Sequence, residues 1–406
     1  HLDLILSLLA PAPLDTAVEQ LSPFHSPSIV VSKNDKSDSP QDIATLPTTY
    51  ATPLLLSAFS AGSNVTGALE DTLATTARVK KSNGICLWDY AACGPYVPID
   101  MNPQNKDMYK KDFVILSTHK FVGGVATPGV MCVKKKLLLN PVPHRPGGGT
   151  VLFVSGDSHT YLSNFEEREE GGTPDIVGSI RAGLAFQLRE TVTAAYIHEK
   201  EEKLRAVVSE VLGTCPFIHL LGVENHHVSS SAADQLPIVS FVVRYPHDPS
   251  LLLHHNFISA LLNDLFGVQS RAGCACAGPY VQANMGIGTE TVSTFLDCIY
   301  EKQEVVRPGM VRINLSYFAP LFEVEYILKA VQWVAVHGWK MLPLYTFVIS
   351  SGEWRHVSKT TKTLGRRWLG SIKYTGAGMS YDTMRERLTV HGKGVARAAD
   401  AHAEMS

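Results

Sequence analysis

Residues 112–124 read DFVILSTHKFVGG, and this stretch decides the fold. Its unbroken apolar run predicts a short buried strand, and the polar residues after that run predict a loop at the strand's carboxyl end. Sheets of parallel strands place their ligands at that end. Lys120 is therefore a candidate for a binding or covalent role, and a surface lysine in a loop is the ordinary alternative.

The sequence around this stretch alternates between strand and helix patterns. A helix is expected over 67–81. A buried strand is expected over 54–60, and two more strands are expected over 84–88 and 129–133. Strands separated by helical or loop crossovers predict an α/β domain with a mainly parallel sheet.

The C-terminal half has a different pattern. One long helix is expected over 175–212, followed by a strand over 237–245, a helix over 249–266, a strand over 311–318 and a helix over 322–338. This mixture predicts a second, smaller α+β domain.

Composition narrows the possible functions. With 406 residues, 45% of them apolar, the chain can bury the cores of two or three domains. Its formal charge of −2 does not favour nucleic acid or an anionic membrane as a partner, and no apolar run is long enough to cross a bilayer. Seven dispersed cysteines are typical of a reducing compartment, so we expect a cytoplasmic protein and no disulfide scaffold or metal site.

Six motifs occur in a recognisable order: SAFSAGSNVTG, CLWDYAACGPYVPIDM, STHKFVGGVATPGVMCVKKKLL, EEREEGGTPDI, RAGCACAGPY and VRINLSYF. Together they resemble the pyridoxal-phosphate (PLP)-dependent class V aminotransferase family, in its cysteine desulfurase-like branch, over roughly Leu54 to Gly338. The resemblance implies a large PLP-binding domain of fold type I and a smaller C-terminal domain. We expect an irregular or disordered segment over 1–50, the large domain over 51–195, the small domain over 196–345 and an extension over 346–406.

The resemblance also implies which residues hold the cofactor. Lys120 matches the lysine that forms a Schiff base with PLP and later moves the Cα proton. Asp89 matches the carboxylate that keeps the pyridine nitrogen protonated, which makes the ring an electron acceptor. Asn64 matches the hydrogen-bond donor to the phenolic oxygen, and Ser117 and His119 match ligands of the phosphate.

Other positions imply a substrate site and a dimer. Arg312 matches the arginine that holds the substrate's carboxylate, and Arg271 belongs to the same substrate site. Cys276 matches the nucleophile that takes sulfur as a persulfide, with Cys274 as an alternative nucleophile and a buried small side chain as the ordinary alternative. Thr173 matches a residue that reaches the phosphate of a neighbouring subunit, which implies a homodimer.

The chain also departs from the family pattern. Ala92 replaces a polar residue that would bond the phenolic oxygen, and the residues before Asn64 contain no glycine-rich phosphate loop at a helix N-terminus. The resemblance is therefore to a member shortened at its N-terminus.

Three functions follow from these residues. The first is cysteine desulfuration, with a cysteine-like substrate and a possible sulfur-acceptor protein. The second is another PLP reaction, either transamination or a β-elimination of the selenocysteine lyase kind. The third is an inactive homologue that acts as an interaction protein.

Overall fold

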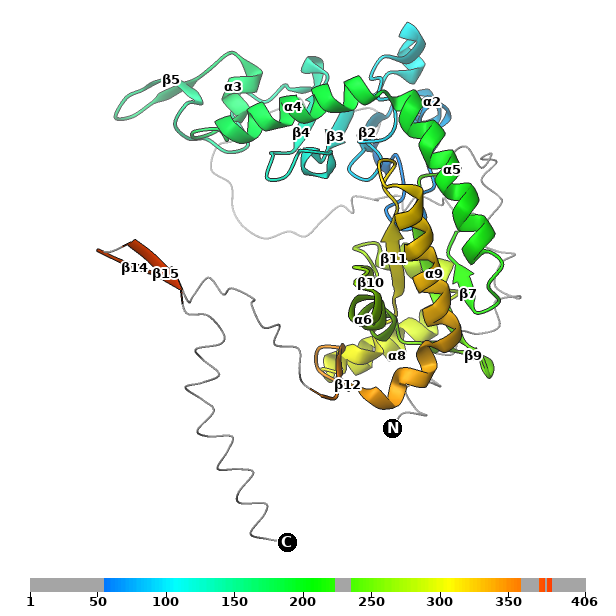
Figure 1. The fold of residues 1–406 in the computed structure, drawn as a ribbon. Helices are drawn as coiled ribbons and strands as arrows, with labels where there is room; N and C mark the ends of the chain where they lie inside the picture. Colours follow the sequence, from blue (N-terminus) through cyan, green and yellow to red (C-terminus); the bar gives the residue numbers. More distant parts are fainter. Residues whose placement is uncertain (1–54, 223–234, 359–371, 377, 382–406) are drawn as a thin grey trace.

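The computed structural model describes residues 55–222, 235–358, 372–376 and 378–381 (Figure 1). The expected irregular segment 1–50, and most of the expected extension 346–406, lie outside these residues. In the first sheet the strand order is β1-β2-β3-β4, with β1, β2 and β3 parallel and β4 antiparallel to β3. These strands are β1 Leu56–Ser60, β2 Ile85–Asp89, β3 Phe113–Leu116 and β4 Val130–Val133. The prediction of a mainly parallel sheet in the N-terminal half is confirmed.

The two central strands carry the core of this sheet. Trp88 and Val114 are almost completely buried, and the indole Nε1 of Trp88 donates a 2.9 Å hydrogen bond to Thr76 Oγ1 on α2 (Thr72–Lys81). The prediction of a buried strand over 54–60 is wrong, because β1 is the edge strand of the described sheet and Leu56 is 59% exposed. Helix α2 begins later than expected because Asp71 Oδ1 accepts hydrogen bonds from the first N–H groups of that helix.

The long helix expected over 175–212 is two helices, α4 (Ile176–Val192) and α5 (Ala194–Leu212). Thr193 separates them with a φ of 69°, which a β-branched residue rarely adopts. Helix α4 lies along the first sheet, and α5 turns away to run beside α9 (Leu321–His337) against the second sheet (Figure 1). Because the chain changes direction at Thr193, one continuous stretch of helical sequence packs against both sheets.

The second sheet is antiparallel. Its strand order is β10-β11-β8-β7, and β9 also pairs with β8. The strands are β7 Ile218–Leu220, β8 Ile238–Tyr245, β9 Asp248–Leu253, β10 Arg271–Gly273 and β11 Met310–Asn314. Helices α5, α6 and α9 pack around this sheet in one apolar core.

The prediction of a helix over 249–266 is wrong for the first part of this range. Residues 248–253 form strand β9, and helix α6 spans only His255–Phe266. Leu252 and Leu253 pair with the edge of β8 and are buried there, and His254 Nδ1 then accepts the N–H of Asn256 as a helix cap. A short apolar run of this kind does not distinguish strand from helix by periodicity alone.

The remaining elements lie outside these two sheets. The hairpin β12–β13 packs against α6, and β5, β6 and α3 project from the end of α4 (Figure 1). Their bounds are α3 Phe165–Glu169, α7 Gly278–Asn284, α8 Thr289–Tyr300, β5 Val151–Val154, β6 His159–Tyr161, β12 Tyr345–Val348, β13 Glu353–His356, β14 Ile372–Thr375 and β15 Gly378–Tyr381. None of the helices described has the length and apolar character needed to cross a membrane. The domain boundaries stay a prediction.

Candidate functional site

Three of the expected site residues follow the three parallel strands of the first sheet. Asn64 comes after β1, Asp89 is the last residue of β2, and Lys120 follows β3. Because these strands run parallel, their carboxyl ends meet at one edge of the sheet. The expected position of Lys120 at a strand end is confirmed.

Lys120 ends a single 3-10 turn, Thr118–Lys120, whose N-cap residue is Ser117. The side chains of His119 and Lys120 are exposed, and Lys120 forms no ion pair with a carboxylate of any described residue. In the same turn Thr118 Oγ1 is buried without a hydrogen-bond partner in the described part of the chain. The turn thus presents the accessible amine of Lys120 beside the polar side chains of Thr118 and His119.

Cys93 links the surroundings of Asp89 and Lys120. Its thiol is fully buried, and burial raises its pKa to about 12. Among the nearby charges, the Asp89 carboxylate raises this pKa and the Lys120 ammonium lowers it, so the thiol lies within electrostatic reach of both. Cys93 was not predicted as a site residue, and its place in the turn just after Asp89 was the available signal.

Asp89 has one carboxylate oxygen engaged locally. Its Oδ1 accepts a 2.7 Å hydrogen bond from the N–H of Ala91, as in a simple turn. The side chain is half-buried. A carboxylate held by its own turn in this way keeps a second oxygen for a ligand.

A narrow cleft opens beside Lys120. Tyr96, Arg189 and Tyr317 line it together with Lys120, and they come from the loop after β2, from α4 and from the segment after β11. Arg189 is held in place because its guanidinium donates a 2.6 Å hydrogen bond to the carbonyl of Val97. Nothing in the sequence placed these three side chains near Lys120, because they meet only when the two halves of the chain pack together.

A second group of expected residues gathers on β10 and β11. Arg271 and Arg312 are direct neighbours across these two strands, and an Arg271 guanidinium N–H donates to Cys276 Sγ at 3.3 Å. Asn64 joins them, since its Nδ2 donates to the carbonyl of Ala275 at 2.7 Å and its own carbonyl accepts from Arg312 at 2.7 Å. The structure therefore brings together the strand-end Asn64 and the residues expected to bind substrate.

Arg312 is the more buried of the two arginines. Burial lowers its pKa, the positive charge of Arg271 lowers it further, and Cys276 opposes the shift. Its Nε is buried and has no hydrogen-bond partner among the described residues. An unsatisfied buried donor costs roughly 1–3 kcal/mol, more for a charged group, so this guanidinium is suited to receive an anion.

The loop that carries the two candidate thiols has an unusual backbone. Ala275 and Cys276 both have positive φ angles, of 50° and 61°, a conformation that costs a non-glycine residue free energy. Cys276 is exposed and Cys274 is half-buried. Of the two thiols, only that of Cys276 accepts a hydrogen bond from an arginine in the described structure, although Cys274 lies within electrostatic reach of Arg307.

Thr173 lies apart from these residues within one chain. It is exposed and precedes the first turn of α4, at the end where α3 and the β5–β6 hairpin project (Figure 1). Over the described ranges, no cluster of His, Cys, Asp and Glu has the composition of a metal site.

Comparisons with known proteins identify the family of this chain. Residues 16–325 match the family aminotransferase class-V, a match that begins before Leu54, where the motifs start. A cysteine desulfurase of Escherichia coli O6:K15:H31 is 28% identical over 243 residues, which is 60% of this chain and 54% of that protein. The chain thus spans about half the length of such curated relatives.

Two solved structures share the fold. An apo cysteine desulfurase from Thermococcus onnurineus NA1 has a TM-score of 0.54 and 24% identity over 69% of this chain and 60% of its own. A cysteine desulfurase from Escherichia coli has a TM-score of 0.53 and 21% identity over 70% and 59%.

Proposed function

The chain belongs to the aminotransferase class-V family, and we propose that it is a PLP-dependent enzyme that moves sulfur from free cysteine to Cys276 and leaves alanine. The observation that carries this proposal is the contact between Arg271 and the Cys276 thiol, 3.3 Å long and next to Arg312. A cationic neighbour stabilises a thiolate, which is the nucleophilic form of cysteine. Transamination does not require a nucleophilic thiol at this position.

The residues present fit PLP. Lys120 offers an accessible amine free of any described carboxylate partner, and Asp89 keeps one oxygen for the pyridine nitrogen. Ser117 and His119 flank the lysine and are proposed as phosphate ligands, with Asn64 as the donor to the phenolic oxygen. When bound, PLP supplies an electron-accepting ring conjugated to the substrate's Cα.

The proposed roles of the protein groups then follow. Arg312 holds the substrate carboxylate through guanidinium donors such as its unpartnered Nε. The Lys120 amine takes the Cα proton. The Cys276 thiolate, held by Arg271, attacks the substrate sulfur: an S–S bond forms, the C–S bond breaks, and its electron pair stays on the substrate carbon. Protonation of that carbon, together with return of the Cα proton from Lys120, gives alanine, and Cys276 keeps the sulfur as a persulfide for a thiol acceptor.

We further propose a homodimer in which Thr173 serves the partner's site. Four side chains spaced four residues apart form an exposed apolar stripe along α4: Ile176, Ile180, Leu184 and Leu188. An apolar stripe of this length favours burial against another surface. Thr173 precedes the stripe directly, so association through α4 brings Thr173 to the boundary between two subunits.

Replacement of single cysteines tests the proposed reaction. With PLP, cysteine and a reducing thiol present, Cys276→Ala is expected to abolish release of sulfide and alanine, while Cys274→Ala, the matched control, keeps most of it. The absorbance of lysine-bound PLP is expected to persist in Cys276→Ala and to be lost in Lys120→Ala. Formation of a keto acid in both cysteine variants would instead identify a transaminase, and PLP uptake in no variant would identify an inactive homologue.

A further inference from the structure

A cavity lies in the second sheet, where two strands share one edge of β8. Strand β11 pairs with the first half of β8, from Ile238 to Phe241, and β9 pairs with its last part, from Val243 to Tyr245. Val242 falls between these two paired stretches. The chain leaves β9 toward α6 on one side and enters β11 from Gly309 on the other, so the sheet opens at this point.

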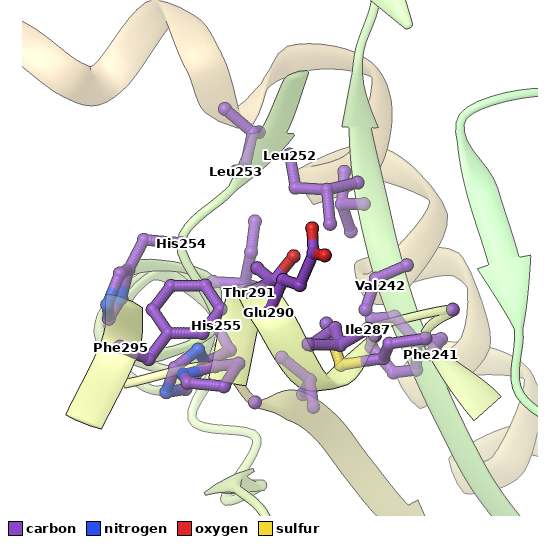
Figure 2. Close-up of a pocket in the computed structure, with 18 of the residues that line it drawn as sticks. Phe241, Val242, Leu252, Leu253, His254, His255, Ile287, Glu290, Thr291 and Phe295 are labelled. Carbon is purple, nitrogen blue, oxygen red and sulfur yellow. The ribbon is translucent and has the colours of Figure 1, made fainter. Parts of the chain in front are cut away.

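The cavity has a volume of about 390 Å³, in the range of small-molecule sites. Its walls are mainly apolar side chains, such as Val242, Leu252, Leu253, Ile287 and Phe295 (Figure 2). The segment from Met285 to Gly288, which joins α7 to α8, covers one side together with the first turn of α8. An apolar cavity of this size has room for the apolar part of a small ligand. The few polar groups of its lining then determine which polar group the ligand carries.

Two stacked imidazoles form one of these polar groups. The rings of His254 and His255 lie 4.3 Å apart. His254 is fully engaged, because Nδ1 accepts from Asn256 and Nε2 donates to the carbonyl of Val305 at 2.8 Å. His255 makes no hydrogen bond to a described residue, and burial beside His254 lowers its pKa well below the usual range. The pair is therefore uncharged at neutral pH.

Glu290 supplies the only formal charge of the described lining. It is the second residue of α8, it is exposed, and no described lysine or arginine pairs with it. In Figure 2 its carboxylate points among the lining residues toward Leu252 and Val242. A negative charge at the rim of an apolar cavity selects a positively charged end on an apolar ligand.

We propose that this cavity is a binding site for a small amphipathic cation, with an apolar body seated between β9 and β11 and an ammonium group at Glu290. The site is separate from the proposed catalytic centre. None of the residues proposed for that centre lines the cavity: Asn64, Asp89, Lys120, Arg271, Cys276 and Arg312 are all absent from its described walls.

The test uses a matched pair of probes that differ in the sign of their charge. N,N-dimethyl-4-phenylbutylamine is a cation whose tertiary nitrogen cannot form a Schiff base with PLP, and 4-phenylbutyrate is its anionic counterpart. Titration calorimetry on the full chain is expected to show saturable binding of the amine and weaker binding of the acid. Binding of the amine is expected to persist unchanged in Lys120→Ala, which separates this cavity from the cofactor site.

Charge variants complete the test. Glu290→Gln is expected to weaken amine binding about fivefold, the effect of losing one exposed charge pair. Glu290→Lys is expected to reverse the preference, so that the acid binds better than the amine. Glu323→Lys is the control, because Glu323 is also an exposed acid in the first turn of a helix, α9, outside the cavity. Absence of amine binding to the wild-type chain, or equal effects of the Glu290 and Glu323 variants, overturns the proposal.

Discussion

Glu201 is a buried carboxyl group on α5, only 3% exposed, and it sits behind the cleft that contains Lys120. Burial raises its pKa to about 7, and Arg205 on the same helix partly offsets this shift. Burial raises the pKa values of Tyr96 and Tyr317, which line the cleft, and the nearby charge of Glu201 raises them further. The protonation state of Glu201 therefore affects both the free energy of unfolding and the electrostatic environment of the tyrosines that line the cleft.

The stability of the chain is expected to depend on pH through Glu201. The folded pKa of about 7 exceeds the ordinary value of 4.5, so between these values the folded state holds a proton that the unfolded state has lost. The contribution is fully present below about pH 4.5 and is lost as the pH rises through 7, by roughly 2–3 kcal/mol. Urea unfolding at pH 5 and pH 8 is expected to show this loss in the wild type and a smaller one in Glu201→Gln.

Glu210→Gln is the matched control for this measurement, since Glu210 is an exposed glutamate near the end of the same helix. An identical pH dependence in wild type and Glu201→Gln would contradict the shifted pKa.

At the residue scale, the sequence predicted the proximity of side chains best where a motif has a fixed spacing. The offset of five residues between Arg271 and Cys276 corresponds to a real contact. Glu201 lies within the charged run from His198 to Lys203, and a charge run gives no sign that one member points inward. Cys93 and Glu201 depend on burial by distant elements, which local sequence does not encode.

Asp112 ties together the elements of the first sheet. It precedes β3, is 2% exposed, and accepts a 2.9 Å hydrogen bond from the N–H of Cys86 on β2. Lys80 on α2 forms an ion pair with Oδ2 of this carboxylate, and Nζ of Lys134, after β4, lies 3.4 Å from its Oδ1. Burial opposes ionisation of Asp112, but the hydrogen bonds from Lys80 and Cys86 outweigh it and lower the pKa of the carboxyl.

Removal of this carboxylate is expected to destabilise the sheet. Asp112→Ala leaves the N–H of Cys86 and two lysines without their acceptor, which costs roughly 3 kcal/mol. Because the pKa is lowered, the stabilisation is present above the ordinary value near 3.8 and is lost as the pH falls below it. Chemical denaturation at neutral pH and at pH 3 measures both effects.

The control is Asp107→Ala, because the Asp107 side chain is 95% exposed although it pairs with Lys110. The two variants are expected to differ clearly at neutral pH and to converge in acid. Equal stability of the two variants at neutral pH would contradict the role given to Asp112.

At the element scale, periodicity found most elements but not their bounds. The strands around Lys120 were found because an apolar run and a turn signal coincide there. Strand β9 was mistaken for helix because Leu251–Leu253 fit both patterns, and only pairing with β8 decides between them. The break at Thr193 carries no glycine or proline, so no local signal marked it.

The whole molecule presents the apolar stripe of α4 to its surroundings. Ile180 is 61% exposed in the middle of that stripe. Ile180→Asp is expected to convert the proposed dimer to monomer in sedimentation velocity, because a buried charge without a partner is costly at an interface. Leu296→Asp on α8, also at an exposed leucine, is the control and is expected to stay dimeric. A wild-type monomer at micromolar concentration would rule out the dimer.

Mixed subunits test whether Thr173 crosses the interface. Lys120→Ala and Thr173→Ala chains are each expected to be impaired alone. A mixed dimer has one site with an intact Lys120 and an intact Thr173 from the partner subunit, so co-expression is expected to restore roughly a quarter of wild-type activity. Activity no higher than that of the two parents would place Thr173 outside the shared site.

The loop after β1 is synthesised long before the residues that bind it. The Val65 carbonyl accepts from Ser240 Oγ, 175 residues later, and the Asn64 carbonyl accepts from Arg312, 248 residues later. At about 5–20 residues per second, a ribosome delivers these partners roughly 9 to 50 s after the loop itself. The first sheet therefore waits without the partners of this loop, and contacts of such large sequence separation form slowly. Synonymous codon changes that alter translation speed between residues 65 and 312 act on this interval, and so on the yield of folded protein.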